Sequence, residues 1–387
     1  NFCSVLKKKN LDKKIQKITG LIIDPYFSGT KIKWIIDNNR VAKKLIKQNN
    51  LLFGTIDTWL LWNLTEKKSH LTDITNASRT MLFDPKEEEW SDELLKIFKI
   101  PKKILPKVTS NTYHFGETNL FGKGPIKIGG MAGDQQAANI GQVCFKKGQS
   151  KSTYGTGCFL LTNIGEKFRL SKNKLLTTVA YKIGNKKIYC FEGSIFVAGS
   201  AIQWLRDNLL LFKNSKETDK LYTKADSNEN IVVVPALTGL GAPYWKPNVR
   251  GGILGLTRNT SISDIVKATL DSIGYQTGHL IKCIQKDAKI KIKEMRVDGG
   301  MIENENFLQS LSNILQIRII KPENNETTAL GAAYLAALSV GLVQDTKSIT
   351  KLWKSTKIFT PKIKKKEIKK KIKAWEEGVK ILVKYHS

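Results

Sequence analysis

The segment MAGDQQAA, residues 131–138, places one carboxylate, Asp134, between an apolar run and a series of small helix-forming residues. The preceding IKIGG, residues 126–130, is rich in isoleucine and glycine. This order predicts a buried strand over 126–133, a tight turn, and a helix from residue 135, which is where an open α/β sheet presents chemistry. An aspartate here can also act as an N-cap for backbone N–H groups, so two interpretations of Asp134 stay open.

The composition is typical of a globular chain with room for two domains. It has 387 residues and a mass of 43.5 kDa, with 41% hydrophobic and 25% charged residues. No apolar run approaches the ~20 residues of a membrane span, so we expect no membrane insertion. The five scattered cysteines form no CxxC pair. They favour a reducing, cytoplasmic compartment and indicate neither a disulfide framework nor a zinc site.

The chain is strongly basic, with 64 Lys+Arg against 34 Asp+Glu and a formal charge of +30. Such a charge can attract nucleic acid or anionic membranes. The lysines, however, occur singly or in short runs along the whole chain, and no basic motif interleaved with aromatic residues appears. We therefore expect a solvated basic surface and no nucleic-acid partner; steep salt-dependent DNA binding would contradict this expectation.

The sequence divides at a polar connector, FKKGQSKS, residues 145–152. This predicts a first domain over 1–144 and a second over 145–387. The chain starts with Asn1 and continues in a segment that reads as the middle of a helical region. We therefore expect the chain to lack an N-terminal part.

Several local predictions concern single elements. Residues 20–38 predict a Pro-containing turn and then an amphipathic helix with Ile32, Ile35 and Ile36 on its apolar side. An apolar run over 51–63 predicts a strand followed by a helix, and 72–84 predicts a loop and strand near the surface. The basic C-terminal segment keeps a stripe of apolar residues at helical spacing, which predicts a surface helix: Ile368, Ile372, Trp375, Val379 and Leu382.

Glycine-rich turns recur beyond the connector. Gly155-Thr156-Gly157 is predicted at a hairpin tip, Gly199 at a helix start, and Gly299-Gly300 between a strand and a helix. Turns without Cβ atoms let a polyanion approach backbone N–H groups, and helix N-termini favour its charge. Each turn alone is usually only turn geometry. Three of them in one α/β domain, together with the Asp134 turn, favour a nucleotide cleft.

The motifs now quoted resemble those of the glycerol kinases, within the FGGY family of carbohydrate kinases, over about residues 1–385. The matching strings, in order, are YFSGTKIKWIIDN (26–38), LLFGTIDTWLLW (51–62), TDITNASRTMLFD (72–84), MAGDQQAA (131–138), STYGTGCF (152–159), AGSAIQWLRD (198–207), PALTGLGAPYW (235–245), RVDGG (296–300) and TALGAAYLA (328–336). The resemblance implies two actin/hexokinase-like (ribonuclease H-like) α/β domains around a cleft, the first of them incomplete. It also implies transfer of the ATP γ-phosphate to glycerol, giving sn-glycerol 3-phosphate and ADP.

The resemblance carries roles over to single positions on the acceptor side. Asp134 corresponds to the catalytic base and contacts glycerol, and it is an indirect candidate for Mg²⁺. Tyr26 and Gln135 match contacts to glycerol hydroxyls, and Phe159 matches an apolar wall beside the carbon chain. Tyr26 packing only a turn, and Phe159 belonging only to the core, stay open as alternatives.

On the nucleotide side, Thr156 matches a phosphate contact. Four further positions match residues that line the adenosine part of ATP: Gly199, Gln203, Gly300 and Asn304. The implied cofactors are ATP and Mg²⁺, the implied substrate is glycerol, and the family also implies a homo-oligomer, a dimer or tetramer, for a complete chain.

The sequence departs from the family in one large respect. It contains no Asp-x-Gly-Thr phosphate loop and no Arg-Glu pair of the kind that holds glycerol in the family. Phosphoryl transfer depends on positioning and charge neutralisation, so we expect the 387 residues by themselves to have negligible kinase activity. Ordinary ATP-dependent phosphorylation of glycerol by the purified chain would contradict this. The open alternatives are another FGGY sugar kinase and a non-catalytic remnant.

Overall fold

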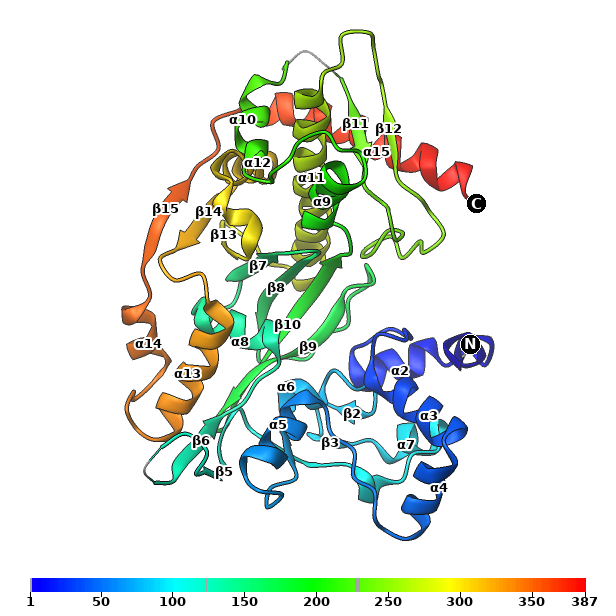
Figure 1. The fold of residues 1–387 in the computed structure, drawn as a ribbon, viewed down its shortest axis with the longest axis vertical. Coiled ribbons are helices and arrows are strands. Elements are labelled where there is room, and N and C mark those ends of the chain that lie inside the picture. Colours follow the sequence, from blue (N-terminus) through cyan, green and yellow to red (C-terminus); the bar gives the residue numbers. More distant parts are fainter. Residues whose placement is uncertain (1, 123, 227–229) are drawn as a thin grey trace.

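The computed structural model describes residues 2–122, 124–226 and 230–387. Figure 1 shows two lobes that meet along the strands β9 (Leu176–Ile183) and β10 (Lys186–Ile195). The small lobe contains residues 2–111 and the large lobe the remainder of the chain. In the described part, no helix is long and apolar enough to cross a lipid bilayer.

A mixed sheet of seven strands forms the centre of the large lobe, in the order β15-β14-β13-β7-β8-β10-β9. Its other strands are β7 (Ser150–Tyr154), β8 (Cys158–Gly165), β13 (Glu294–Asp298), β14 (Arg318–Pro322) and β15 (Ser355–Phe359). β13 runs parallel to β7 and β14. The strands β7–β8 and β9–β10 form antiparallel hairpins, and β8 pairs antiparallel with β10 between them. The predicted hairpin with its tip at 155–157 is present. A further hairpin joins β9 and β10, with Gly184-Asn185 at its turn.

Helices cover this sheet. The longest, α11 (Ile262–Ala288), begins at a capping box in which Ser261 and Asp264 bind each other's backbone N–H groups. The others in the large lobe are α8 (Asp134–Gly141), α9 (Gly199–Asp207), α10 (Glu217–Lys224), η2 (Gly300–Glu303), α12 (Glu305–Leu315), α13 (Thr327–Ser339), α14 (Thr346–Leu352) and α15 (Lys365–Tyr385). Short antiparallel pairs add β5 (Thr112–Thr118) with β6 (Ile126–Gly130) and β11 (Val232–Val234) with β12 (Gly252–Leu254).

The small lobe is mainly helical. Its helices are α1 (Phe2–Lys8), α2 (Asp12–Thr19), α3 (Ser28–Asn38), α4 (Arg40–Lys47), α5 (Ile56–Leu64), α6 (Ile74–Ala77), α7 (Asp92–Phe98) and η1 (Lys102–Ile104). Its strands form two short pairs: β1 (Leu71–Asp73) with β4 (Lys107–Thr109), and β2 (Phe83–Asp84) with β3 (Glu89–Trp90).

Two glycines bring α8 and α13 into close contact. A Cβ on Gly331 would lie 1.8 Å from the carbonyl oxygen of Ala137, and a Cβ on Gly141 would lie 2.0 Å from that of Thr327. Only glycine fits at both positions, which explains the small residues of the 328–336 string. As Figure 1 shows, α8, β5 and β6 therefore lie with α13 in the large lobe, although they precede the polar connector.

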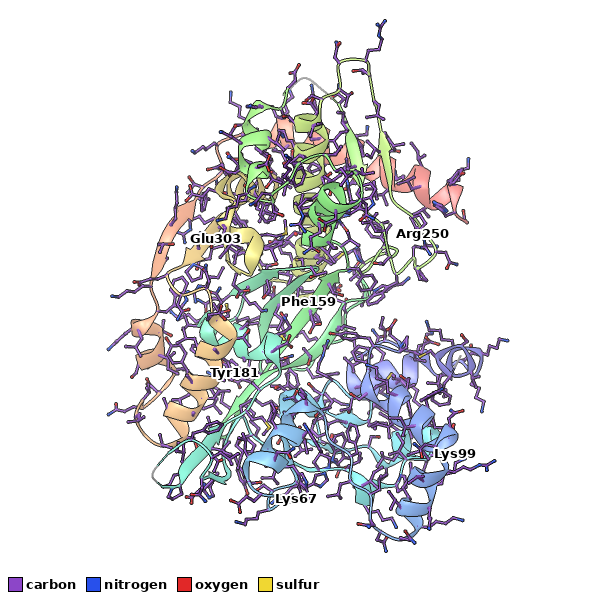
Figure 2. The ribbon with its side chains drawn as sticks, in the orientation of Figure 1. Lys67, Lys99, Phe159, Tyr181, Arg250 and Glu303 are labelled. Atoms are coloured by element: carbon purple, nitrogen blue, oxygen red, sulfur yellow. The ribbon has the colours of Figure 1, made fainter. Side chains whose placement is uncertain are left out.

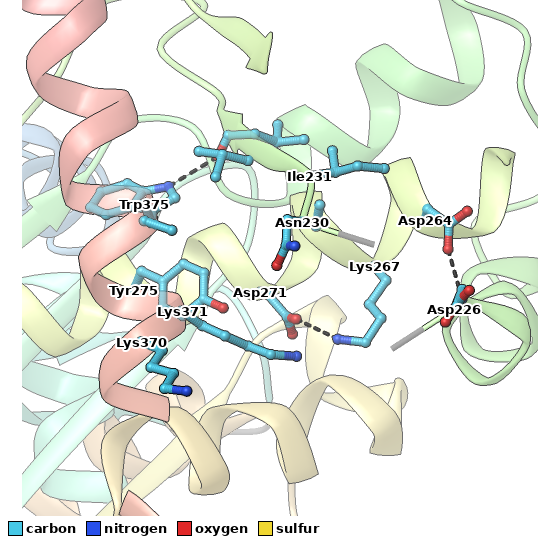
Figure 3. Close-up of a pocket in the computed structure, with 14 residues that line it drawn as sticks. Asp226, Asn230, Ile231, Asp264, Lys267, Asp271, Tyr275, Lys370, Lys371 and Trp375 are labelled. Carbon is cyan, nitrogen blue, oxygen red and sulfur yellow. Dashed lines mark hydrogen bonds and ion pairs between the residues drawn. The ribbon is translucent and has the colours of Figure 1, made fainter. Parts of the chain in front are cut away.

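The C-terminal helix α15 has the predicted apolar stripe. Ile368, Trp375, Val379 and Leu382 are buried, and the Trp375 indole Nε1 donates to the carbonyl oxygen of Val233 at 3.0 Å. A cavity of about 130 Å³ lies where this helix meets α11 (Figure 3). It contains none of the predicted site residues, and its Lys267 and Asp271 form an ion pair at 2.6 Å.

Three local predictions were wrong or only partly right. Residues 51–55 form no strand: Leu51 and Phe53 pack against the core from an irregular segment that leads into α5. Residues 72–84 are largely buried and include the helix α6, so they do not form a surface loop. In α3, Ile32 is buried as predicted but Ile35 is exposed.

Candidate active site

Asp134 is the first residue of α8 and is exposed. The N-cap of this helix is Gly133, and no side chain caps it. The carboxylate of Asp134 instead accepts one hydrogen bond, from the Gln135 side-chain Nε2 at 3.2 Å. The N-cap interpretation is therefore wrong, and the carboxylate keeps lone pairs free for a ligand.

The turn before Asp134 is held from the small lobe. The backbone N–H of Gly133 donates to the hydroxyl of Thr75 at 2.9 Å. Two hydrogen bonds join Met131 and Asn111: the Met131 backbone N–H donates to the Asn111 carbonyl oxygen at 3.0 Å, and the Asn111 side-chain Nδ2 donates to the Met131 carbonyl oxygen at 2.9 Å. The hydrogen bonds of Asn111 continue to the buried Asp73 carboxylate at 2.7 Å. The 72–84 string thus positions the Asp134 turn, a role that its sequence did not reveal.

Asp73 itself has an unusual protonation equilibrium. Burial, and next the neighbouring Asp57, raise the pKa of Asp73 to about 7, although hydrogen bonds from Thr75 and Asn76 oppose the shift. The folded state therefore binds a proton that an unfolded aspartate, with a pKa near ~3.9, has already released. This contribution to stability is complete below about pH 4 and is lost as the pH rises through about 7.

We expect the free energy of unfolding to fall by up to about 1.4 kcal/mol per pH unit in that window because of this group. Urea unfolding at several pH values between 5 and 8 measures the slope. Asp73→Asn removes the titrating group, so its stability should depend less on pH. An identical slope in the variant and the parent protein would contradict the assignment.

Lys151 lies directly beneath Gln135. It is on β7, is 0% exposed, and its ammonium donates to the Gln135 Oε1 at 2.5 Å and to the Thr153 hydroxyl at 2.8 Å. Thr153 pairs with Phe159 across β7 and β8, so both share the sheet face of Lys151. Phe159 is half-buried and outside the core, at the position labelled in Figure 2. Gln135 and Phe159 therefore lie on one face of the sheet.

Arg79 links Tyr26 to this face of the sheet. Tyr26 is 57% exposed, and the Arg79 guanidinium lies 5.7 Å from its ring centroid. The same guanidinium forms two hydrogen bonds, at 2.8 and 2.9 Å, with the carboxylate of Glu192 on β10. Glu192 and Lys151 both pair with Leu161 on β8, so they share the face on strands two apart, about 10 Å from each other. The sequence singled out neither Arg79 nor Lys151.

A cavity of about 760 Å³ opens beside the hairpin tip. All five residues predicted for the nucleotide line it: Thr156, Gly199, Gln203, Gly300 and Asn304. They come from the β7–β8 hairpin, α9, η2 and the N-cap of α12. Their shared location is an observation, and their contact with a nucleotide stays a prediction.

Glycine permits this arrangement at one position, Gly199. The backbone N–H of Gly199 donates to the carbonyl oxygen of Gly155 at 2.9 Å, and a Cβ on Gly199 would approach that oxygen to 2.5 Å. By contrast, a Cβ on Gly155 or Gly300 would meet no atom within 4 Å, so these two face open space. Asn304 caps α12 through its oxygen, to the backbone N–H of Phe307 at 2.8 Å, and its amide donates to Thr218.

The residues present fit Mg²⁺ only as a partner of bound phosphates. No group of three or more His, Cys, Asp or Glu side chains that could hold a metal occurs in the described ranges. Mg²⁺ typically binds one or two carboxylates and takes its other ligands from phosphates and water. The exposed Asp134 carboxylate, with its single hydrogen bond, can supply such a contact.

Comparison with known proteins now places the chain. Residues 1–141 match the N-terminal domain of the FGGY family of carbohydrate kinases, and residues 151–340 match its C-terminal domain. The chain belongs to this family. The predicted resemblance and the α/β fold class are thereby confirmed.

Individual relatives agree with this assignment. Glycerol kinase 1 of Clostridium tetani is 49% identical to this FGGY kinase over 381 residues, which cover 98% of this chain and 76% of the relative. A crystal structure of Plasmodium falciparum glycerol kinase with ADP is 38% identical, with a TM-score of 0.92, and covers 98% of this chain and 76% of that one. A xylulose kinase from Lactobacillus acidophilus, at 22% identity and a TM-score of 0.87, shares the fold.

Proposed function

We propose that this FGGY kinase transfers the γ-phosphate of ATP to glycerol, giving sn-glycerol 3-phosphate and ADP. The observation that carries the proposal is the exposed Asp134 carboxylate beside Gln135 at the start of α8, with Gln135 bonded to Lys151 on β7, the strand that leads to the nucleotide cavity. From Lys151 on β7 to Gly155, just past the end of that strand, the chain advances by four residue steps, about 13 Å, which is suited to an acceptor and a triphosphate placed end to end. The identity with glycerol kinases supports glycerol over other acceptors.

In the proposed mechanism, Asp134 orients the attacking hydroxyl of glycerol and accepts its proton as the new O–P bond forms. Gln135 and Tyr26 bind the remaining hydroxyls, and Phe159 packs against the carbon chain. Polar partners that a bound substrate covers discriminate strongly against substrates that lack a hydroxyl. The hydroxyl and backbone of Thr156 bind the phosphates at the hairpin tip.

The nucleotide would be held by Gly199, Gln203, Gly300 and Asn304. ATP would supply the phosphoryl group. Asp134 is the residue that would hold Mg²⁺, indirectly, beside the phosphates, and the ion would supply neutralisation of their charge. We accordingly assign residues 1–144 to the acceptor side and 145–387 to the nucleotide side. All five cysteines are free thiols, which supports a cytoplasmic location. The homo-oligomer stays a prediction, which the molar mass measured by light scattering would test.

Binding provides the first test of the proposal. We expect the purified chain to bind ADP, and to bind glycerol more tightly than xylulose or ribulose in NMR titrations with ADP present. Transfer is then followed with the protein in excess over labelled ATP, so that a single slow turnover is detectable. Absence of ADP binding would support the non-catalytic remnant, and a preference for a pentulose would support another FGGY kinase.

The nucleotide cavity offers a further prediction. Gly300→Val should lower ADP affinity by about tenfold or more, because its side chain would project into open space beside the adenosine. The fold should tolerate the change, since the new Cβ meets no atom within 4 Å. Isothermal titration calorimetry measures the affinity. Gly122→Val, at an exposed glycine outside the cavity, is the matched control and should bind ADP as the parent does.

A further inference from the structure

Lys151 is a buried cation without a buried anion. Its side chain is 0% exposed, and no carboxylate of the described residues forms an ion pair with it. Glu192, the acidic residue on the same sheet face, is already bonded to Arg79. A lysine in such surroundings loses hydration that two neutral hydrogen bonds only partly replace, so its presence lowers the stability of the fold.

The Lys151 ammonium orients the side chain of Gln135. A lysine ammonium has three donors and no acceptor, so Gln135 must present its Oε1 to Lys151. The other end of the amide, the Nε2 group, then necessarily points away and donates to the Asp134 carboxylate at 3.2 Å. The oxygen and NH₂ ends of the amide are nearly equivalent in shape. Without Lys151, the Gln135 amide could therefore flip and direct its oxygen at the Asp134 carboxylate.

The contacts thus form one directed chain, Lys151 to Gln135 to Asp134, from a rigid central strand to the first turn of α8. The bond from Lys151 to Thr153 anchors the ammonium on β7 itself. A charged donor at the start of the chain also polarises the amide, which strengthens the hydrogen bond that its Nε2 makes.

We propose that Lys151 is a positioning residue for the acceptor site: it fixes the side-chain orientation of Gln135, and through it the Asp134 carboxylate, at the expense of fold stability. The inference rests on the proposed function of Asp134 and Gln135. It adds a residue that touches neither the glycerol nor the nucleotide in the proposed mechanism.

The test replaces the charge with an apolar group of similar length. Lys151→Met should lower glycerol affinity, measured by NMR titration with ADP present, by about tenfold, the usual loss for a hydrogen bond to a charged group. Its unfolding temperature should stay the same or rise, because the desolvated charge is gone. A structural lysine would instead lower the unfolding temperature together with affinity.

A double-variant comparison shows whether Lys151 acts through Gln135. Gln135→Ala lowers affinity by itself, and adding Lys151→Met to it should cause no further loss. Independent, multiplying losses would overturn the inference. The matched control is Lys187→Met, a largely buried lysine that does have a carboxylate partner, Glu88, at 2.9 Å. It should lower the unfolding temperature and leave glycerol affinity unchanged.

The outcomes separate the two proposals. A parent chain that binds no glycerol contradicts the proposed function, and the unfolding temperature of Lys151→Met then decides the inference alone. A clear fall in that temperature overturns it, whereas an unchanged or higher value supports it.

Discussion

Asp134→Asn should lower the single-turnover rate of glycerol phosphorylation by about a thousandfold, within the range usual for loss of a general base. Asparagine keeps the shape of the side chain and one oxygen that can accept from Gln135, but its amide accepts no proton from the glycerol hydroxyl. Affinities for ADP and glycerol should change only a few-fold, since the loss falls on the transition state.

The matched control is Asp92→Asn, an exposed carboxylate in the first turn of α7, far along the chain from the site. It should leave both the rate and the affinities as they are. If Asp134→Asn retained the rate of the parent chain, Asp134 would not be the base, and the central assignment would be withdrawn.

Arg79→Met should lower the free energy of unfolding by about 3–5 kcal/mol, the usual effect of breaking a buried ion pair on one side. The Glu192 side chain is only 1% exposed, so it would be left as an uncompensated buried charge. Because Arg79 belongs to the small lobe and Glu192 to β10, the loss should also loosen the contact between the lobes. Urea unfolding measures the stability.

The double variant Arg79→Met with Glu192→Met removes both charges. It should recover a large part of the lost stability, because no unpaired ion then remains. Glycerol affinity should be lower than in the parent chain in both the single and the double variant, because both lack the Arg79 guanidinium that packs against the ring of Tyr26. A single variant as stable as the parent would show that solvent reaches Glu192 and that the pair does not join the lobes.

Local patterns predicted the parts of the fold whose causes lie close together in the chain. The hairpin around 155–157 and the apolar stripe of α15 both depend on residues a few positions apart. The same reasoning failed at 51–55: apolar composition alone does not make a strand, and these residues pair with no strand of the described part of the chain.

The motif strings identified the family. They also supplied the candidate residues of the site, whose roles stay predictions. Burial and long-range partners could not be inferred in that way. Nothing in the sequence distinguishes Lys151 from the other lysines, and only the position of β7 brings its ammonium to Gln135. Arg79 and Glu192 form their ion pair although 113 positions separate them in the sequence. Hydrogen bonds and desolvation act over a few ångströms in space, so these roles exist only once the lobes and the sheet have brought the groups together.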